Sequence, residues 1–355
     1  MIPQREYFDK DIANSDNTSG YYIIEKNDFV YNPRKSTDAP YGPISSYKYA
    51  EAGIVSPLYL CFRAKKEINS AFFEWYFRSS AWHRYVYTSG DSGARHDRVS
   101  IKDDTFFAMP INLPSAHEQE HIASFLERID QRIEMQRSLV DNLKKYKRGL
   151  ISAILKQKVV ITHEDEKWEE VSLSDVADGF EYGMNAAATS FDGEHKYIRI
   201  TDIDDDAHTY IDYEPVSPSG VLDEKYRVKE DDILFARTGA SVGKSYLYRK
   251  TDGDLFFAGF LIRIHVKESI DSEYVFLNTL TEEYDKWVLL ESARSGQPGI
   301  NAEQYRRYRF KIPPLRTQRK IAAIAQKLDS QIQKETMSLR LLQEQKLGLL
   351  QHLFI

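Results

Sequence analysis

The sequence contains a single cysteine, Cys61, among 355 residues. One cysteine cannot form an internal disulfide, and it cannot supply a cysteine-based zinc site. The N-terminus is polar, so no signal peptide is expected. The chain also has no run of about 18 uncharged apolar residues that could span a membrane. These absences predict a cytoplasmic protein without membrane contact.

The chain is not expected to be an enzyme, and none of its nine histidines is expected to bind zinc. The segment Gly239–Ser245 resembles a phosphate-binding loop, but only three residues separate its glycines where that loop needs four, and the residues after it are typical of a strand. We therefore predict a hairpin turn at this segment, and a non-catalytic chain that binds no metal or cofactor of its own.

The composition fits a folded protein of two or three domains. Hydrophobic residues make up 42% of the chain, which is enough for extensive burial. The net charge of −6 argues mildly against a nucleic-acid partner, because nucleic-acid-binding domains are usually basic.

The most informative feature of the sequence is an internal repeat. Gln119 matches Gln318 at an offset of 199, and the same offset holds without a gap over some 40 residues. It pairs Pro114 with Pro313, Ile122 with Ile321, Ala123 with Ala322, Asp130 with Asp329, Ile133 with Ile332, Lys147 with Lys346, Gly149 with Gly348 and Leu150 with Leu349. A fixed offset of this length indicates a duplication. A duplicated chain is a pseudo-dimer, so we expect its target to have two halves.

Each repeat opens a long helix with a coiled-coil seam, in which apolar residues recur in steps of four and three. The apolar seam residues are Ile122, Leu126, Ile129, Ile133, Val140, Leu143 and Leu150 in the first helix, and Ile321, Leu328, Ile332, Leu339, Leu342 and Leu349 in the second. A parallel pairing would set Lys147 against Lys346. An antiparallel pairing lets each lysine extend to water beside an apolar partner. We therefore predict an antiparallel coiled coil of roughly 60 Å rather than two unrelated surface helices.

A mixed α/β segment precedes each long helix. In the second segment we predict strands at Lys196–Ile203, Asp232–Ala236, Ser245–Tyr248 and Leu255–Val266. An amphipathic helix capped by Asp271 should follow, with Tyr274, Leu277, Tyr284 and Trp287 as its apolar residues. The first segment repeats this order more loosely, with Lys26–Val30 similar to Glu230–Leu234 and a helix from Ala71 whose aromatic side chains are expected in the core.

The expected fold class is therefore α/β (α+β), with two mixed α/β heads joined by two long helices. The predicted boundaries are 1–113 for the first head, 114–158 for the central helix, 159–311 for the second head and 312–355 for the C-terminal helix.

Several motifs resemble the specificity (S) subunits of type I restriction-modification systems. They are Trp168-(x)4-Leu173-(x)2-Val176, the run Tyr197–Ile203, the run Ala236–Lys244, the Ile-Pro-Pro-Leu-(x)2-Gln-(x)2-Ile-Ala start of the C-terminal helix and the Lys-x-Gly-Leu near its end. The resemblance covers nearly the whole chain.

The resemblance implies a non-catalytic subunit whose two heads are target-recognition domains, each reading one half of a split site in double-stranded DNA. It implies two methyltransferase (modification) subunits as partners, with restriction subunits where the system has them, and S-adenosylmethionine and ATP bound by those partners. The alternative from another functional class is a coiled-coil adaptor whose heads bind proteins.

Basic residues on the predicted recognition loops are the candidate DNA contacts. They are Arg237, Lys244, Arg294, Arg306 and Arg307 together with Gln297 in the second head, and Arg95 and Arg98 in the first. Much of the acidic charge falls on the flanks of the heptads, so the net charge does not exclude DNA binding.

The first head is expected to be shorter than the second. Asp28 matches Asp232 at an offset of 204, which leaves no counterpart for Trp168–Asp204. That stretch should supply a strand, so we expect the first head to be incomplete. The chain is then expected to be a truncated, mis-started or rearranged gene product, or to borrow the missing element from another chain.

Overall fold

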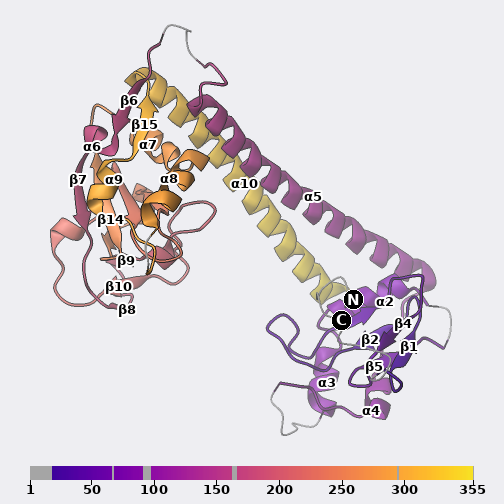
Figure 1. Cartoon of the computed structure of the whole chain (residues 1–355). Helices are drawn as coiled ribbons and strands as arrows, with labels where there is room; N and C mark the ends of the chain where they lie inside the picture. The colour runs from indigo at the N-terminus through magenta and orange to yellow at the C-terminus, as the bar shows by residue number, and fades with distance from the viewer. Residues whose placement is uncertain (1–17, 66–67, 91–96, 162–165, 294–295, 355) are drawn as a thin grey trace. The chain divides into compact units, whose positions relative to one another are not determined.

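The computed structural model describes residues 18–65, 68–90, 97–161, 166–293 and 296–354 (Figure 1). The chain forms two compact units. Unit 1 comprises Met1–Val140 and Lys334–Ile355, and unit 2 comprises Asp141–Gln333. Among the helices described, none is both long enough and apolar enough to cross a membrane.

Two long helices, α5 (Ala116–Leu155) and α10 (Leu315–Leu353), contribute to both units. Each begins directly after a proline-containing segment, where the missing proline N–H costs no helical hydrogen bond. The duplication extends to the hydrogen bonds at this start: the Gln119 side chain donates to the Pro114 carbonyl at 2.9 Å, and the Gln318 side chain donates to the Pro313 carbonyl at 2.8 Å.

The two long helices run antiparallel, as predicted. In unit 1, Asp130 of α5 pairs with Lys346 of α10 at 2.5 Å, and Gln136 contacts the Glu335 carboxylate at 2.7 Å. From the first contact to the second, the residue numbers rise along α5 and fall along α10, so the helices are antiparallel. The expectation that the seam lysines extend to water was wrong. Lys147 pairs with Asp329 and Lys346 pairs with Asp130, and each aspartate is the residue next to the apolar seam residue that was expected to face the lysine.

The apolar seam positions on both helices are buried or half-buried, whereas the helix flanks are largely exposed. In unit 1, Leu126 is fully buried against the aromatic core of the head, and in unit 2 Ile154, Ile321 and Ala325 are buried in the core of the second head. The long helices are therefore part of the core of each unit.

The described residues of unit 1 before α5 form five short strands and three short helices. They are β1 (Tyr22–Ile24), β2 (Phe29–Tyr31), β3 (Ile44–Ser46), β4 (Gly53–Val55), β5 (Leu60–Phe62), α2 (Ser70–Arg78), α3 (His83–Ser89) and α4 (Asp103–Phe107). An antiparallel sheet has the order β3-β2-β5, and β1 pairs with β4 in a separate antiparallel ribbon.

Helix α2 forms the aromatic core of unit 1. Asn69 caps it by accepting a hydrogen bond from the Phe72 backbone N–H at 3.0 Å. The predicted core residues Phe72, Phe73, Tyr76 and Phe77 are all buried, which confirms that interpretation.

Besides the long helices, the part of unit 2 that the structure describes has ten strands, four short helices and three 3₁₀ turns. The elements are β6 (Glu169–Ser172), α6 (Leu173–Val176), β7 (Ala177–Tyr182), β8 (Ala188–Ser190), β9 (Lys196–Ile198), η1 (Ile200–Asp202), β10 (Val216–Pro218), η2 (Glu224–Tyr226), β11 (Asp232–Ala236), β12 (Ser245–Leu247), η3 (Lys250–Asp252), β13 (Leu255–Phe257), β14 (Leu261–Val266), α7 (Ser272–Asn278), α8 (Glu282–Ser292), α9 (Ala302–Arg306) and β15 (Arg309–Ile312).

The main sheet of unit 2 has the order β12-β11-β14-β7 and is antiparallel throughout. Strand β11 is buried on both faces: Ile233 and Phe235 face one core cluster, and Leu234 and Ala236 face another. Three smaller pairs complete the unit, with β9 parallel to β13, β8 antiparallel to β10 and β6 antiparallel to β15. The mixed helix and sheet class is confirmed.

Three predicted elements of unit 2 are divided in the structure. The predicted strand Leu255–Val266 is two strands, because a turn at Ala258–Phe260 separates β13 from β14. The predicted strand Lys196–Ile203 ends at Ile198, since Asp202 accepts hydrogen bonds from Arg199 and closes a 3₁₀ turn. The predicted helix after Asp271 is interrupted, because Thr281 caps a new helix, α8.

The heads of the two units share a common set of strands. Each central strand follows a residue with left-handed backbone, Asn27 with φ 73° before β2 and Asp231 with φ 66° before β11. The Tyr47 N–H donates to the Asp28 carbonyl at 2.7 Å, and the Tyr248 N–H donates to the Asp232 carbonyl at 3.1 Å. Strands β2, β3, β4 and β5 thus correspond to β11, β12, β13 and β14.

Among the residues described, unit 1 has fewer strands than unit 2 around this common set. β1 is not the counterpart of β9. β1 pairs with β4 in antiparallel fashion, and the equivalent contact in unit 2 is the antiparallel β-bridge between Arg227 and Phe256. β9 instead pairs with β13 in parallel. Within residues 18–65, 68–90 and 97–113, no strand corresponds to β6, β7 or β9.

Candidate functional site

The segment between β11 and β12 is a tight turn, as predicted. Gly239 and Gly243 have φ of 80° and 89°, values that favour glycine. A side chain at Gly243 would lie 2.6 Å from the Val288 methyl groups, and the Gly243 carbonyl accepts a hydrogen bond from the Tyr284 hydroxyl at 2.7 Å. The strand β12 follows directly, so the near match to a phosphate-binding loop has no helix behind it.

Arg237, at the start of this turn, has a side chain that is held in place without being neutralised. Its backbone N–H donates to the Phe260 carbonyl at 3.0 Å, and its own carbonyl accepts from Ile300 at 2.9 Å. The guanidinium carbon lies 4.9 Å from the centre of the Tyr182 ring, and the buried Nε has no hydrogen-bond partner. A guanidinium positioned by an aromatic ring is suited to a phosphate or to the edge of a guanine.

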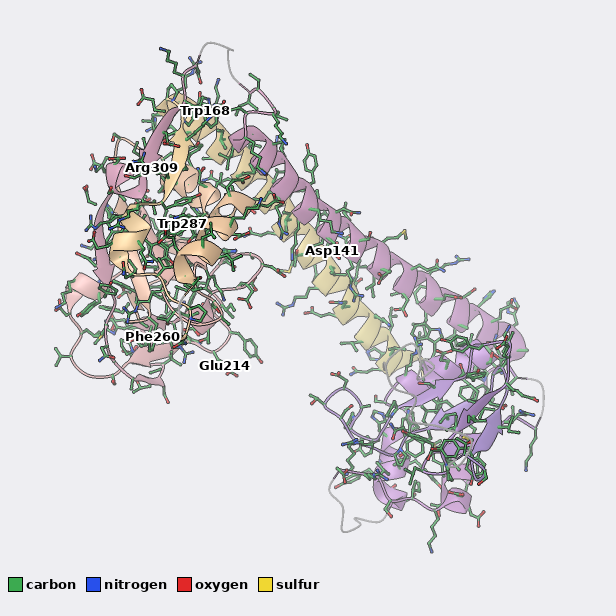
Figure 2. The ribbon with its side chains drawn as sticks, in the orientation of Figure 1. Asp141, Trp168, Glu214, Phe260, Trp287 and Arg309 are labelled. Atoms are coloured by element: carbon green, nitrogen blue, oxygen red, sulfur yellow. The ribbon has the colours of Figure 1, made fainter. Side chains whose placement is uncertain are left out.

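A cavity of about 660 Å³ opens beside Arg237. Aromatic and basic side chains line it, including Tyr182, Tyr197, Arg199 and Phe260. Phe260 is 62% exposed and lies at the turn between β13 and β14. Figure 2 shows it at the end of unit 2 away from Trp168. This mixture of rings and cations is suited to a nucleic acid, whose bases stack and whose phosphates attract cations.

Arg199 is the second cation of the cavity. Its guanidinium donates to both oxygens of Asp202, at 2.7 and 2.8 Å, and these hydrogen bonds raise the pKa of Arg199. Asp202 thus fixes the position of Arg199, and the pair has little net charge to offer a ligand. Arg237 is therefore the stronger candidate for direct contact.

Lys244 does not line this cavity, and its side chain is engaged in contacts within the protein. Its ammonium donates to the Ile203 carbonyl at 2.9 Å and pairs with Asp205, and only 10% of its side chain is exposed. The sequence predicted a DNA contact here. The structure shows that Lys244 anchors the 200–205 loop, so a DNA contact would compete with an internal ion pair.

The loop before α9, at residues 296–301, contacts the backbone of the turn that begins at Arg237, although the two segments are far apart in sequence. The Gly239 N–H donates to the Pro298 carbonyl at 3.0 Å, and Thr238 forms a bridge with Gly299. Gln297 is exposed beside Gly239. The structure thereby brings together two predicted contacts, Arg237 and Gln297. Arg294 lies outside the described residues.

The remaining predicted contacts are dispersed. Arg306 donates to the Gly179 carbonyl at 3.1 Å and lies 4.4 Å from the centre of the Phe180 ring, whereas Arg307 is exposed. In unit 1, Arg98 is half-buried, and its backbone forms an antiparallel β-bridge with Arg34. Arg95 lies outside the described residues.

A second cavity of unit 2, of about 310 Å³, is lined mainly by charged residues. Asp232 is buried there, 2.8 Å from His265 Nδ1, and burial raises the pKa of Asp232. Arg263 completes the cluster by pairing with Glu181. Its carboxylates would repel DNA phosphates, so this cavity is a poor candidate for nucleic acid. Across the described part of the chain, no cluster of three His, Cys, Asp or Glu residues could hold a metal ion.

Sequence reasoning missed Tyr182 and Phe260 as site residues. Phe260 follows a glycine in a run of apolar residues, which we interpreted as a continuous strand. The signal for Phe260 was Gly259, which marks a turn and hence an exposed position for the aromatic residue after it. Tyr182 carried no local signal.

Solved structures of specificity subunits resemble this chain in fold. One, described for complex assembly and conformational transition of the type I R-M system, has 18% identity and a TM-score of 0.60, with 92% of this chain and 81% of that chain covered. The HsdS subunit from Thermoanaerobacter tengcongensis has 18% identity and a TM-score of 0.50, with coverage of 92% and 80%. The S subunit of a type I system from M. genitalium has 16% identity and a TM-score of 0.50, with coverage of 97% and 87%.

A family model covers most of the chain. The model of the type I restriction modification DNA specificity domain matches residues 9–145 and, a second time, residues 165–342. The search of curated proteins found no match. The double match and the shared fold confirm the resemblance drawn from the motifs, and the chain belongs to the type I restriction modification DNA specificity domain family.

Proposed function

We propose that this chain reads a bipartite site in double-stranded DNA, one half with each head, and directs methylation by partner modification subunits. Its family supplies DNA specificity and is in general non-catalytic. The observation that carries the proposal is the duplicated set of contacts on the long helices. Lys346 pairs with Asp130, and Lys147 pairs with Asp329, at positions that the offset of 199 makes equivalent.

This duplication supports a target with two halves. Equivalent residues exchange roles between α5 and α10, and the equivalent residues Gln136 and Glu335 contact each other directly, as expected at a pseudo-twofold axis. The cavity at Arg237 supports base reading by the second head, because a guanidinium held against the Tyr182 ring lines it.

The proposed DNA contacts differ in kind. Arg237 and Gln297 lie together and are proposed to reach base edges. Arg306, Arg307 and Arg98, together with Arg294 and Arg95, are proposed to contact phosphates, which would fix the register on DNA without reading sequence. Lys244 is proposed to act through the 200–205 loop that it anchors, with direct contact as the alternative.

The partners are proposed to be two modification subunits per chain, with restriction subunits where the system includes them. A pseudo-twofold offers two equivalent docking surfaces. One of the similar structures is described for complex assembly of the type I R-M system. The expected complex has two modification subunits, and sedimentation equilibrium of the co-purified complex measures this. A one-to-one complex with an intact chain contradicts it.

Selection from a random DNA library tests the reading function. The full chain, co-expressed with its modification subunits, should enrich a motif with two specified halves and an unspecified spacer. Methylome sequencing of the source strain with and without the gene should show the same motif losing its methylation. Enrichment of no motif, together with an unchanged methylome, overturns the proposal.

Salt dependence separates DNA reading from the adaptor alternative. The logarithm of DNA affinity should fall linearly with the logarithm of salt concentration, by about 0.9 for each phosphate neutralised. A protein adaptor would show a partner affinity with a much smaller slope and no affinity for DNA.

A further inference from the structure

The β1–β4 ribbon of unit 1 presents an apolar outer face. Ile23 of β1 lies directly opposite Ile54 of β4, and these side chains are 71% and 53% exposed. In the part of unit 1 that the structure describes, β1 is the only strand paired with β4. The ribbon therefore combines an unpaired strand edge with exposed isoleucines, both of which favour pairing with another strand.

The second unit contains the same ribbon. The turn after β4 has the Tyr59 N–H donating to the Ser56 carbonyl at 3.1 Å. The turn after β13 has the Leu261 N–H donating to the Ala258 carbonyl at 2.8 Å, at an offset of 202. By the same offset, Ile54 is equivalent to Phe256. Ile23 lies opposite Ile54 in the β1–β4 ribbon, and in unit 2 Arg227 forms the equivalent antiparallel β-bridge with Phe256.

In unit 2 this position is covered. Phe256 is fully buried, and β9 pairs in parallel with β13 so that Tyr197 lies opposite Phe256. Met184 is buried in the same cluster, and the Tyr197 hydroxyl donates to the Met184 carbonyl at 2.7 Å, which fixes the cover in place. Unit 1, as described, has no residue in this role, and Ile54 is correspondingly exposed.

We propose that β4 accepts an extended segment of a partner polypeptide as a parallel strand, with an aromatic residue over Ile54 as Tyr197 lies over Phe256. Such strand addition uses main-chain hydrogen bonds for affinity and a side-chain contact for specificity. It also completes a two-stranded ribbon, which is marginally stable on its own.

The structure favours a short segment over a second copy of the chain. A stable dimer needs about 800 Å² buried per partner, far more than two isoleucine side chains offer. A second copy also has its own β9 already paired with β13, and Tyr197 is only 2% exposed. The partner strand must therefore be free before it binds.

A peptide with the sequence of residues 193–204 is the probe, because it contains β9 and its flanks. The fluorescein-labelled peptide is titrated with the full chain and followed by anisotropy. Saturable binding to the wild type is expected, with a loss of about tenfold or more in Ile54→Lys. The matched control is Leu290→Lys, which places the same charge on another exposed leucine (77% exposed) and should bind as the wild type does.

Two further measurements make the result decisive. A peptide with aspartate in place of Tyr197 should bind about tenfold more weakly or not at all, and hydrogen exchange should show peptide-dependent protection of residues 53–55. If Ile54→Lys lowers the melting temperature, Ile23→Lys replaces it.

Three results would overturn the proposal. The first is no saturable binding of the peptide, and the second is equal binding by wild type and Ile54→Lys. The third is concentration-dependent dimerisation, lost in Ile54→Lys without any peptide binding, because this would assign the face to a second copy.

Discussion

Lys147 of α5 donates to both carboxylate oxygens of Asp329 of α10 at 2.6 Å, and the equivalent pair Asp130–Lys346 repeats this contact with the helices exchanged. The side chain of Lys147 is only 19% exposed, whereas that of Asp329 is 40% exposed. The pair thus brings a positive charge into an apolar seam and partly neutralises it there.

Replacing Lys147 by methionine should leave stability within about 1 kcal/mol of the wild type or raise it, since an apolar side chain of similar length fits the seam. Asp329→Ala should cost about 1 kcal/mol, because it leaves the half-buried ammonium without its partner. Urea unfolding of the full chain measures both. The exposed pair Arg340–Glu344 serves as a control, and its removal should change little. A large loss in Lys147→Met would contradict this view of the seam.

Arg237→Ala should weaken DNA binding by about 1–3 kcal/mol and relax the preference in only one half of the site, because the guanidinium lines the proposed base-reading cavity. Anisotropy with DNA substituted in each half measures this. Arg309→Ala is the matched control, since Arg309 is exposed and pairs with Glu170 on β6. Equal weakening on all sequences, with a smaller salt slope, would make Arg237 a phosphate contact.

Lys244→Met should lower the stability of unit 2 by about 1–3 kcal/mol, because the Ile203 carbonyl and Asp205 lose their shared cation. The salt slope of DNA binding should stay unchanged. Thermal unfolding and DNA titrations at several salt concentrations test the two parts separately. A smaller slope with unchanged stability would instead identify Lys244 as a direct phosphate contact.

The half-buried His208 should make unit 2 sensitive to mild acid. Burial lowers the pKa of His208, whose Nδ1 lies 2.9 Å from the Ser245 carbonyl. His208 therefore binds a proton more readily in the unfolded chain than in the folded chain. The contribution of His208 is complete above the unfolded pKa of about 6.5 and is lost as the pH falls towards the folded pKa.

Unfolding curves between about pH 7.5 and pH 5 measure this effect. His208→Gln keeps a hydrogen-bond donor and cannot titrate, so its stability should fall less steeply over that range. Parallel curves for the two proteins would show that His208 is not responsible.

Gly243→Ala should destabilise unit 2 by about 1–3 kcal/mol, because the backbone is left-handed and a Cβ would meet Val288 at 2.6 Å. Gly348→Ala is the contrasting variant. No atom lies within 4 Å of a Cβ there, and the residue is inside α10, so a gain of about 0.5–1 kcal/mol is expected. Melting temperatures of both variants test the pair of predictions, and a tolerated Gly243→Ala would contradict the packing seen at the turn.

The long helices and their direction could be predicted from the residues alone. A seam repeating every three and four residues is set by contacts along one face of a helix, and the offset of 199 is visible without any structure. The repeated lysines Lys147 and Lys346 were sufficient to reject a parallel pairing. Their aspartate partners were not foreseen, because Asp329 and Asp130 lie beside the seam rather than on it.

The candidate site and the difference between the heads became visible only in the folded chain. Tyr182, Arg237 and Phe260 converge on one cavity from three separate segments, and their meeting depends on strand pairing and register that no local pattern encodes. Lys244 and Arg237 looked alike in sequence, yet Lys244 is held by Asp205 and Arg237 lies over the Tyr182 ring at the cavity. The exposed Ile54 became informative only beside its buried equivalent Phe256, because burial is a property of what covers a residue and not of the residue itself.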